Sequence, residues 1–434
     1  MPEDPKPTGT PVIVSHRSTV GVRHVGRRVV PERLLARLMD RPYPVMAAHA
    51  GHMVVAADPV EVVRGEAVWD ALAEPRVQGG RPPAGGWIGL LSYDLAGTVE
   101  SLPPPRPDAG GPPTAVLCRY LTVATITPDG ACAVAGVGSP AAAQELARLA
   151  ERCDDPLVVR GGPGGGEAAS SLPPCAYRER VAAIRDFIRA GDCYQVNLAQ
   201  RLRARWDRGP LEFAARLWRA AGPSSHRGYL GLPEGTLVSA SPERLVAVRD
   251  GVAFSEPIKG TAPVGQAAPL AASVKDRAEH VMIVDLVRND LGRVARTGGV
   301  SVTHLCEPLR TDYVEHLVSR VRAELRADVT PRDVLRAMFP GGSVTGCPKV
   351  RAMEVIHELE PVSRGPAYGS LVVAGPDHSL EASVLIRTAW LSGGEVRYWS
   401  GGAVTWDSDP DDEHREAMTK AAPFAAALGD LPVR

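Results

Sequence analysis

The chain has 434 residues, of which 44% are hydrophobic and 23% are charged, and its formal net charge at pH 7 is −1. Such values are typical of a globular protein with a sizeable core, and they argue against a nucleic-acid partner or a membrane partner. No uncharged apolar run approaches the ~20 residues of a membrane span, and the first residues lack the pattern of a signal peptide. Seven scattered cysteines without a C-x-x-C pair favour reduced thiols, so we expect a cytoplasmic protein.

The first part of the chain is predicted to consist mainly of short strands. Alternating runs at 43–56 and 115–127 predict strands, and 141–153 predicts a helix that closes this region. The segment 155–174 has five glycines in six positions and ends in Pro-Pro, which is typical of a flexible linker or an exposed loop. We therefore divide the chain into an N-terminal region, a linker and a region that carries the motifs below: 1–154, 155–174 and 175–434.

After the linker, predicted helices and strand pairs are mixed. A helix at 176–190 ends at Gly191 and is followed by a strand at 193–204. Strand pairs are predicted at 235–256, where Asp250 and Gly251 form the turn, and at 379–401. Further helices are predicted at 271–295, 331–339, 348–359 and 410–428. Since strands and helices do not alternate strictly, this order indicates an α+β fold with large antiparallel sheets and helices outside.

Two of the predicted helices carry acidic pairs at helical spacing. Asp276 and Glu279 are three residues apart, as are Glu413 and Glu416, and Lys420 follows one turn later. If the two helices meet, their carboxylates would suit Mg²⁺, which binds few protein oxygens and keeps water for a substrate. The alternative is that both pairs lie on solvated faces, where Glu416 and Lys420 support the helix as an i,i+4 pair.

A glycine-rich turn, FPGGSVTGCPK at 339–349, opens a predicted helix at about Pro348. Backbone amides at a helix N-terminus attract anions. The spacing of a P-loop is absent, so a carboxylate ligand fits better than a nucleotide. A purely structural turn is the alternative, because glycines often punctuate loops.

Four single residues are candidates for chemistry. Only five of the 49 basic residues are lysines, and Lys259 stands in EPIKGT, where arginine could not act as a nucleophile. Glu243 precedes it by sixteen residues, in what we predict to be the neighbouring strand, so both could face one pocket. Arg387 is predicted to lie in a strand, where burial would require a carboxylate partner. His316 is either a packed histidine or a catalytic one.

Eight segments carry a resemblance to a known family. They are AGDCYQVNLAQR, SASPERL, EPIKGT, KDRAEHVMIVDLVRNDLGRV, HLVS, FPGGSVTGCPKVRAMEVI, IRT and DEHREAMTK, in this order. Together they resemble the chorismate-utilising enzymes, from about residue 176 to the C-terminus, and GGWIGLLSYDL at 85–95 extends the similarity. The pattern is most similar to the aminodeoxychorismate synthase component I branch, which is related to anthranilate synthase component I.

The resemblance implies two packed antiparallel sheets with helices outside and an active site in the C-terminal part. It implies Mg²⁺ held chiefly by Glu279 and Glu416, with Asp276 and Glu413 reaching it directly or through water. The metal would bind the ring carboxylate of chorismate, and Arg387 and Tyr368 would hold the carboxylate of the enolpyruvyl arm. Further substrate contacts are implied for Gly342, Thr345, Gly346, Gly402, Lys420 and Thr261.

The resemblance also implies catalytic roles. Glu243 would protonate the departing C4 hydroxyl, and His316 would lie beside the ring near that hydroxyl. The amine of Lys259 would attack C2, after which ammonia would attack C4 and expel the lysine. Gln195 stands where related enzymes carry a base lysine that activates water, which favours an amine nucleophile. No glutaminase motif is visible, so we expect a separate glutamine amidotransferase subunit to supply ammonia.

Two alternatives to the amination of chorismate at C4 remain at this stage. The first is anthranilate synthase component I, which aminates C2 and releases pyruvate. The second is a catalytically silent, chorismate-binding subunit. Ala403, in GGAVTW, replaces a usual glycine of the family and motivates this second alternative.

Overall fold

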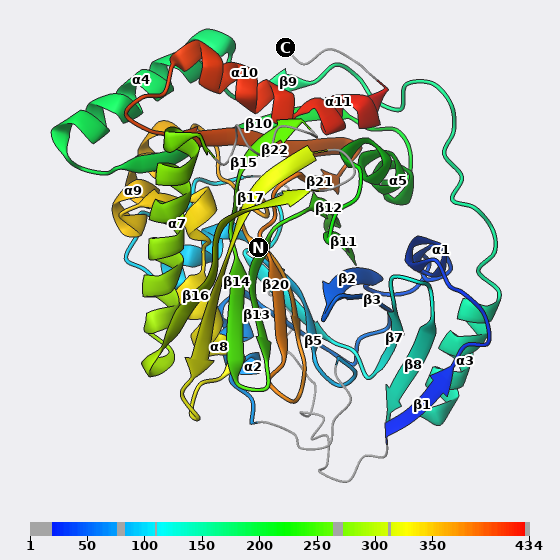
Figure 1. Ribbon diagram of the computed structural model, residues 1–434. Helices are drawn as coiled ribbons and strands as arrows, with labels where there is room; N and C mark the ends of the chain where they lie inside the picture. The colour runs from blue at the N-terminus through cyan, green and yellow to red at the C-terminus, as the bar shows by residue number, and fades with distance from the viewer. Residues whose placement is uncertain (1–19, 76–82, 109–110, 264–271, 311–313, 430–434) are drawn as a thin grey trace, which may run out of the picture.

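The computed structural model describes residues 20–75, 83–108, 111–263, 272–310 and 314–429 (Figure 1). Its strands form two sheets in which neighbouring strands run antiparallel, and helices cover their outer faces. The predicted α+β fold with large antiparallel sheets is therefore confirmed. No helix within these residues is long and apolar enough to cross a membrane.

The two sheets have 12 and 10 strands. The larger one has the order β1 (Val20–His24), β8 (Cys132–Val137), β7 (Thr122–Ile126), β3 (His52–Ala56), β2 (Val45–His49), β11 (His226–Leu232), β12 (Gly235–Ser241), β21 (Thr388–Ser392), β22 (Glu395–Val404), β10 (Gln195–Arg205) and β18 (Gly346–Cys347), with β9 (Ala169–Ser170) paired to β10. The smaller one has the order β15 (Ile258–Pro263), β17 (Val314–Leu325), β14 (Val252–Glu256), β13 (Arg244–Arg249), β20 (Leu380–Ser383), β19 (Ser370–Ala374), β5 (Trp87–Leu91), β6 (Ala115–Arg119) and β4 (Glu61–Arg64), with β16 (Ala295–Arg310) paired to β17.

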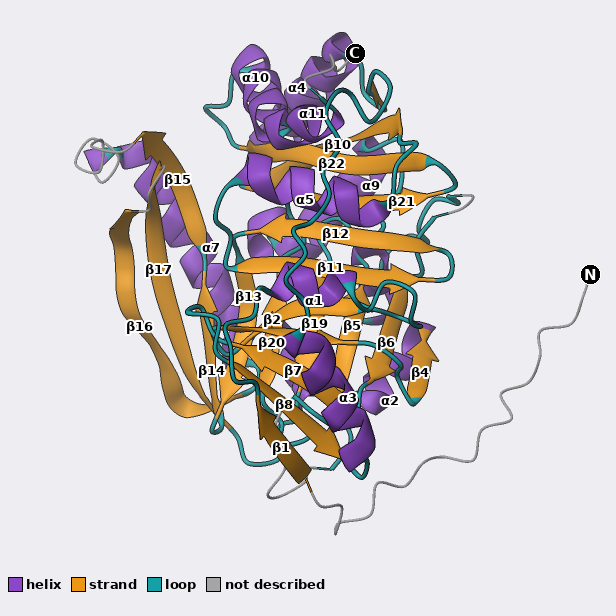
Figure 2. Ribbon diagram, turned by 90° about the vertical axis from the view of Figure 1, so that its right-hand side faces the viewer, coloured by secondary structure: helices purple, strands orange, loops and turns teal. Residues whose placement is uncertain are grey.

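The helices vary in length, and short 3₁₀ turns accompany them. The α-helices are α1 (Pro31–Ala36), α2 (Val68–Ala71), α3 (Pro140–Glu151), α4 (Pro174–Ala190), α5 (Pro210–Ala221), α7 (Val274–Gly292), α8 (Pro331–Met338), α9 (Lys349–Leu359), α10 (Pro410–Lys420) and α11 (Ala422–Leu428). The 3₁₀ turns are η1 (Gly65–Ala67), η2 (Tyr93–Thr98) and η3 (Gly342–Val344). In Figure 2, β15, β16 and β17 project to one side, and α7 packs against β16 and β17.

The largest apolar cluster lies between the two sheets. Val45, Leu237 and Trp390 of the larger sheet are fully buried there, together with Ile88 and Val372 of the smaller one. Burial of apolar side chains of this size stabilises the fold by roughly 1.5–3 kcal/mol each. A second cluster joins the outer face of the larger sheet to helices α3, α5 and α11.

Both sheets combine strands from the two ends of the chain. Met46 of β2 pairs with Tyr229 of β11, and Gly89 of β5 pairs with Val372 of β19. The segment 155–174, which separates the two regions, has little regular structure but is held in place. Arg208 donates hydrogen bonds to the carbonyl oxygens of Gly161 and Pro163, at 3.0 and 2.9 Å.

Several predicted boundaries are confirmed. Helix α4 ends at Gly191, whose φ of 84° is accessible to glycine at little cost, and β10 follows. Asp250 and Gly251 join β13 to β14, as the sequence predicts. The N-cap of α9 is Pro348, which confirms that the glycine-rich turn opens this helix.

Other boundaries were wrong for identifiable reasons. The predicted helix 410–428 is two helices, because Pro423 has no amide hydrogen with which to continue the first one. The predicted strand pair 235–256 is three strands, since Pro242 and Glu243 interrupt it between β12 and β13. The predicted pair 379–401 is also three strands, with a bend between β20 and β21.

Candidate active site

Glu243 lies in the turn between β12 and β13 and not in a strand, so the predicted placement beside Lys259 in one strand pair was wrong. The turn nevertheless holds this glutamate firmly. Its amide donates to Ser241 Oγ at 3.2 Å, and its carbonyl accepts from the amide of Val384 at 3.0 Å. The side chain is 7% exposed, and Ser343 Oγ of the glycine-rich turn donates to its Oε1 at 2.6 Å.

Lys259 lies in β15, which pairs with β17. Part of its side chain reaches solvent, but its amine is closely surrounded by protein atoms. This burial lowers the pKa of Lys259, and the positive charge of Lys420 lowers it further. Glu243, Glu279 and Glu416 oppose that shift in pKa, so all three carboxylates are near enough to act on the amine.

The pKa of Glu243 moves in the complementary direction. Burial raises it, whereas the hydroxyl of Ser343 and the charges of Lys259 and Lys420 hold it down. Both groups are therefore biased toward their neutral forms, a carboxylic acid and a free amine. Such a pair can donate a proton and attack an electrophile within one site.

The acidic residues of α10 gather around Gly402 of β22. A Cβ at this position would lie 3.3 Å from Glu413 Oε2, 3.6 Å from Glu416 Oε1 and 3.7 Å from Lys420 Nζ. Lys420 Nζ pairs with Glu416 Oε1 at 2.6 Å and donates to the carbonyl oxygen of Gly401 at 3.2 Å. The i,i+4 pair of the sequence analysis is thus present; the side chains of Lys420 and Glu416 are 48% and 53% exposed, and both lie near Gly402.

The glycine-rich turn is tightly packed against neighbouring backbone. Thr345 is fully buried, and its Oγ1 donates to the carbonyl oxygen of Gly341 at 3.0 Å. A Cβ at Gly342 would lie 2.4 Å from the side chain of Leu286 on α7. This close approach brings the turn against the helix that carries Glu279.

Replacing Gly346 by alanine should destabilise the fold and disturb the turn. Its φ is +152°, and an added Cβ would lie 2.1 Å from the carbonyl oxygen of Gln195. We expect the free energy of unfolding to fall by ~1–3 kcal/mol because backbone must move. Gly97→Ala is the control, since nothing lies within 4 Å of a Cβ there. Urea unfolding curves compare the two variants, and equal stabilities would contradict the steric argument.

Arg387 occupies the bend between β20 and β21, so its placement in a strand was wrong. Its φ of 49° is left-handed and incompatible with a continuing strand. Among the described residues it forms no ion pair, which leaves its guanidinium available to a ligand. Tyr368 has a φ of 65° and is buried, with the guanidinium of Arg364 4.6 Å from its ring centroid.

Three predicted site residues cannot be placed by their side chains. Thr261 and His316 face each other in the register of β15 and β17, and Asp276 lies in the first turns of α7. The side chains of all three lie outside the described residues. Their predicted contacts with substrate and metal therefore stay predictions.

A buried ion pair that the sequence analysis missed ties the site together. Arg364, 2% exposed, donates to both carboxylate oxygens of Glu360 at 2.9 and 2.6 Å. It also donates to the carbonyl oxygens of Val344 and Asn197, both at 2.7 Å. The pair thus joins the glycine-rich turn to β10. The only signal in the sequence is the opposite charge of two residues four apart in ELEPVSR.

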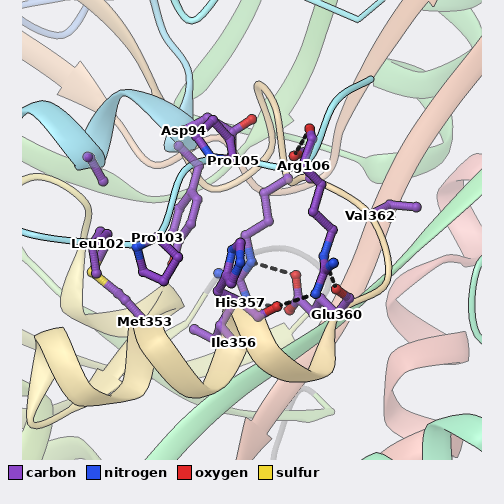
Figure 3. A pocket seen from close by; sticks show the side chains of 15 residues that line it. Asp94, Leu102, Pro103, Pro105, Arg106, Met353, Ile356, His357, Glu360 and Val362 are labelled. Carbon is purple, nitrogen blue, oxygen red and sulfur yellow. Dashed lines mark hydrogen bonds and ion pairs between the residues drawn. The ribbon is translucent and has the colours of Figure 1, made fainter. Parts of the chain in front are cut away.

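A surface pocket opens beside this ion pair (Figure 3). Its walls come from η2, α9 and the segments that follow each of them, and Arg106 donates across it to the carbonyl oxygens of His357 and Glu360 at 2.7 and 3.1 Å. None of the predicted site residues lines it. We therefore place the chemistry at Lys259 and Glu243, on geometric and electrostatic grounds, and not in this pocket.

Two buried polar side chains lie next to the site. The sequence analysis did not single out His280, and it considered Gln195 only as the residue that replaces a base lysine of related enzymes. His280 follows Glu279 on α7, and neither ring nitrogen has a hydrogen-bond partner among the residues placed in the structure. Burial and the charge of Lys259 lower the pKa of His280 to about 4. Gln195 is fully buried at the start of β10, and its amide is likewise without a partner within the placed residues.

Carboxylate oxygens are the type of ligand that a hard cation such as Mg²⁺ takes. The carboxylates of Glu413 and Glu416 lie near Gly402. Those of Glu279 and Glu416 both favour the charged form of Lys259 and so raise its pKa. No group of three or more candidate ligands converges within the described part of the chain. An ion that keeps most of its water shell and uses few protein oxygens fits that arrangement better than one that needs a closed protein cage.

Comparison with known proteins connects this geometry to a family. Residues 33–426 match the family described as chorismate binding enzyme. The chain belongs to this family. It is 40% identical over 259 residues to the aminodeoxychorismate synthase component 1 of Salmonella typhimurium, an alignment that covers 58% of this chain and 57% of that protein. The chain thus aligns with little more than half the length of this relative.

Members with other names are also similar. An anthranilate synthase component I-like protein of Synechocystis is 34% identical over 369 residues, which covers 81% of this chain and 74% of that protein. The crystal structure of anthranilate synthase component I from Streptococcus pneumoniae superposes with a TM-score of 0.74 at 24% identity, over 97% of this chain and 95% of that one. This superposition confirms the fold.

Proposed function

We propose that the chain is component I of a 4-amino-4-deoxychorismate synthase, which aminates chorismate at C4 with ammonia. The observation that carries the proposal is that Glu243, held by Ser343 Oγ at 2.6 Å, and Lys259 act electrostatically on each other, while burial favours the carboxylic acid of the first and the free amine of the second. Nucleophilic substitution on the ring of chorismate needs a nucleophile and an acid that protonates the leaving group, and the amine of Lys259 and the carboxylic acid of Glu243 can fill these two roles. The similarity to proteins named aminodeoxychorismate synthase component 1 supports the same reading.

The proposed reaction is two successive allylic displacements. Glu243 protonates the C4 hydroxyl, which leaves as water while the amine of Lys259 forms a bond to C2. Ammonia then forms a bond to C4, and the bond between Lys259 and C2 breaks to release the lysine. Glu243 is well placed to give its proton because its carboxyl is held by Ser343 and is biased toward the protonated form.

Other residues would orient the substrate. Arg387, which has no ion pair among the described residues, would bind the carboxylate of the enolpyruvyl arm. Lys420 and the turn that contains Thr345 would approach the ring carboxylate. Mg²⁺, held by Glu279 and Glu416 with help from Glu413 and Asp276, would offset the charge of that carboxylate.

Incubation with chorismate, Mg²⁺ and ammonium, followed by chromatography and mass spectrometry, tests the proposal. We expect aminodeoxychorismate, which needs a lyase to become p-aminobenzoate. Anthranilate would instead indicate the second candidate, which the similarity to anthranilate synthase relatives favours. Absence of any product would point to a catalytically silent subunit.

The pH dependence of the reaction should reveal the general acid. Amination should decline as pH rises through the pKa of Glu243, because the deprotonated carboxylate has no proton to give, and burial raises that pKa. Glu243→Gln should lower kcat by ~10²–10⁴-fold and remove the alkaline limb. The rates must be measured at a constant concentration of free NH₃. An alkaline limb that persists in this variant would assign the acid to another group.

A further inference from the structure

The surface pocket of Figure 3 takes no part in the proposed reaction, yet two charged side chains line it without pairing. It holds about 520 Å³ of space free of protein atoms, part of which is open to solvent. A volume of this order suits a small ligand. Asp94 and Arg106 both line the pocket, and within the described ranges neither forms an ion pair, so their charged atoms lie more than 4.0 Å apart.

Asp94 presents a carboxylate oxygen that lacks a donor. The amide of Gly365 donates to its Oδ2 at 3.1 Å, and in the described part of the chain Oδ1 accepts no hydrogen bond. Burial raises the pKa of Asp94 to about 6, so this carboxyl is mostly ionised at neutral pH. Tyr93 also lines the pocket, and its buried hydroxyl likewise has no partner among the placed residues. A ligand with N–H donors would satisfy this side of the pocket.

Arg106 offers the complementary charge. Its Nη2 and Nε donate to the carbonyl oxygens of His357 and Glu360 at the end of α9, whereas its Nη1 forms no hydrogen bond with the residues described. A guanidinium binds carboxylates with defined geometry. Met353 and Ile356 of α9 are buried and give the pocket an apolar wall below Arg106 (Figure 3). The thioether of a methionine makes favourable contacts with aromatic rings, so this wall suits a ring.

We propose that this pocket binds an aromatic carboxylate that carries an amine, of which an aminobenzoate is the simplest member. The carboxylate would bind Arg106, the ring would contact Met353, and the amine would donate to Asp94. An α-amino acid fits less well, because its amine and carboxylate share one carbon, whereas Asp94 and Arg106 are too far apart to pair with each other. The metabolic source of the ligand rests on the proposed function, since p-aminobenzoate is what a lyase would form from its product.

Consecutive polar contacts connect the pocket to the proposed general acid. Arg106 donates to the carbonyl oxygen of Glu360, whose carboxylate holds Arg364. Arg364 donates to the carbonyl oxygen of Val344 in the glycine-rich turn, and the residue before Val344 donates to Glu243. A ligand carboxylate would compete with the carbonyl oxygens of α9 for Arg106 and so weaken this series of contacts. We therefore expect the bound ligand to slow amination.

Titration calorimetry without chorismate tests binding independently of any activity. The wild type should bind p-aminobenzoate saturably, and benzoate, aniline and L-phenylalanine should each bind ~10-fold or more weakly, because each loses a charged hydrogen bond or its position. Asp94→Asn and Arg106→Gln should each raise the Kd for p-aminobenzoate by ~10-fold or more. Asp70→Asn/Arg148→Gln is the matched control, because both residues are exposed on helices α2 and α3 and neither lines the pocket. Thermal unfolding checks that all variants are folded.

The two pocket variants should differ in their rates with chorismate, Mg²⁺ and ammonium. Saturating p-aminobenzoate should slow the wild type by ~5-fold, the lower end of typical coupling between two sites, and saturating chorismate should not relieve the effect. Asp94→Asn keeps the contacts of Arg106, so its rate should stay within ~2-fold of wild type and should not respond to the same ligand concentration. Arg106→Gln should be slow with and without ligand, because its contacts with α9 are lost in both cases.

Four results would overturn this proposal. Absence of saturable binding by the wild type, or an unchanged Kd in both pocket variants, would show that the ligand does not bind here. Equal binding of L-phenylalanine would contradict the class of ligand. Inhibition that saturating chorismate relieves would place the ligand in the substrate site, and binding without any fall in rate would refute the connection to Glu243. Failure of the wild type to use ammonium would instead refute the proposed function, while the calorimetric comparison still tests the pocket.

Discussion

Lys259→Arg should abolish amination at C4 as completely as Lys259→Ala. A guanidinium keeps the positive charge but offers no nucleophile, so the step that bonds the protein to C2 is lost in both variants. We expect the loss to be at least the ~10²–10⁴-fold that removal of a positioned acid or base causes. Product formation from chorismate, Mg²⁺ and ammonium measures it. Lys259→Ala should also give a trace of C2-aminated product, because ammonia can then reach C2 directly.

Mass spectrometry of the wild type tests the covalent step itself. With chorismate and Mg²⁺ but without ammonia, an adduct should appear on the peptide that contains Lys259. Lys349→Arg is the control for the substitution, because Lys349 forms an ion pair with Asp290 Oδ2 at 2.6 Å that a guanidinium can also form. A fully active Lys259→Arg enzyme without any adduct would leave Lys259 an electrostatic role and remove the main reason to prefer C4 over C2.

Glu279→Gln should abolish turnover through loss of Mg²⁺ binding while the fold stays intact. A neutral amide is a weak ligand for a hard cation that has few protein oxygens to begin with. The fall in Mg²⁺ affinity should reach at least the ~10–100-fold that loss of an outer-shell partner causes. Titration calorimetry with Mg²⁺ alone gives this affinity without reference to activity.

The control for this experiment lies on the same helix. Asp285 is an exposed residue of α7 that pairs with Arg288 at 2.7 Å, so Asp285→Asn should bind Mg²⁺ as the wild type does. Thermal unfolding checks that both variants are folded. Wild-type Mg²⁺ affinity in Glu279→Gln would exclude this glutamate from the metal site.

Patterns confined to a short stretch predicted the fold well. The helix predicted at 176–190 and its stop at Gly191 correspond to α4, and the predicted strand that follows corresponds to β10. The turn at Asp250 and Gly251 was equally local. The convergence of Glu413, Glu416 and Lys420 could be expected from helical periodicity, since these residues share one face of α10.

Contacts between distant segments could not be read from the sequence. The backbone at Arg387 turns left-handed because β20 and β21 belong to different sheets, and no residue near it signals that change. The ion pair of Glu360 and Arg364 gains its role from the carbonyl oxygens of Asn197 and Val344, the former 167 positions away from Arg364. The four-residue spacing shows that Glu360 and Arg364 can pair, whereas only the folded structure shows which segments this pair connects.

The interleaving of strands from the two ends of the chain limits how the protein can be divided. A fragment that begins after the segment 155–174 would leave β11 without β2 and β19 without β5, and these open edges would favour aggregation. The complementary fragment would carry the matching edges. A chain cut near residue 162 keeps every strand whole, so the two pieces would have to assemble on each other as they fold. The catalytic region would then behave as one member of an obligate heterodimer and not as an autonomous domain.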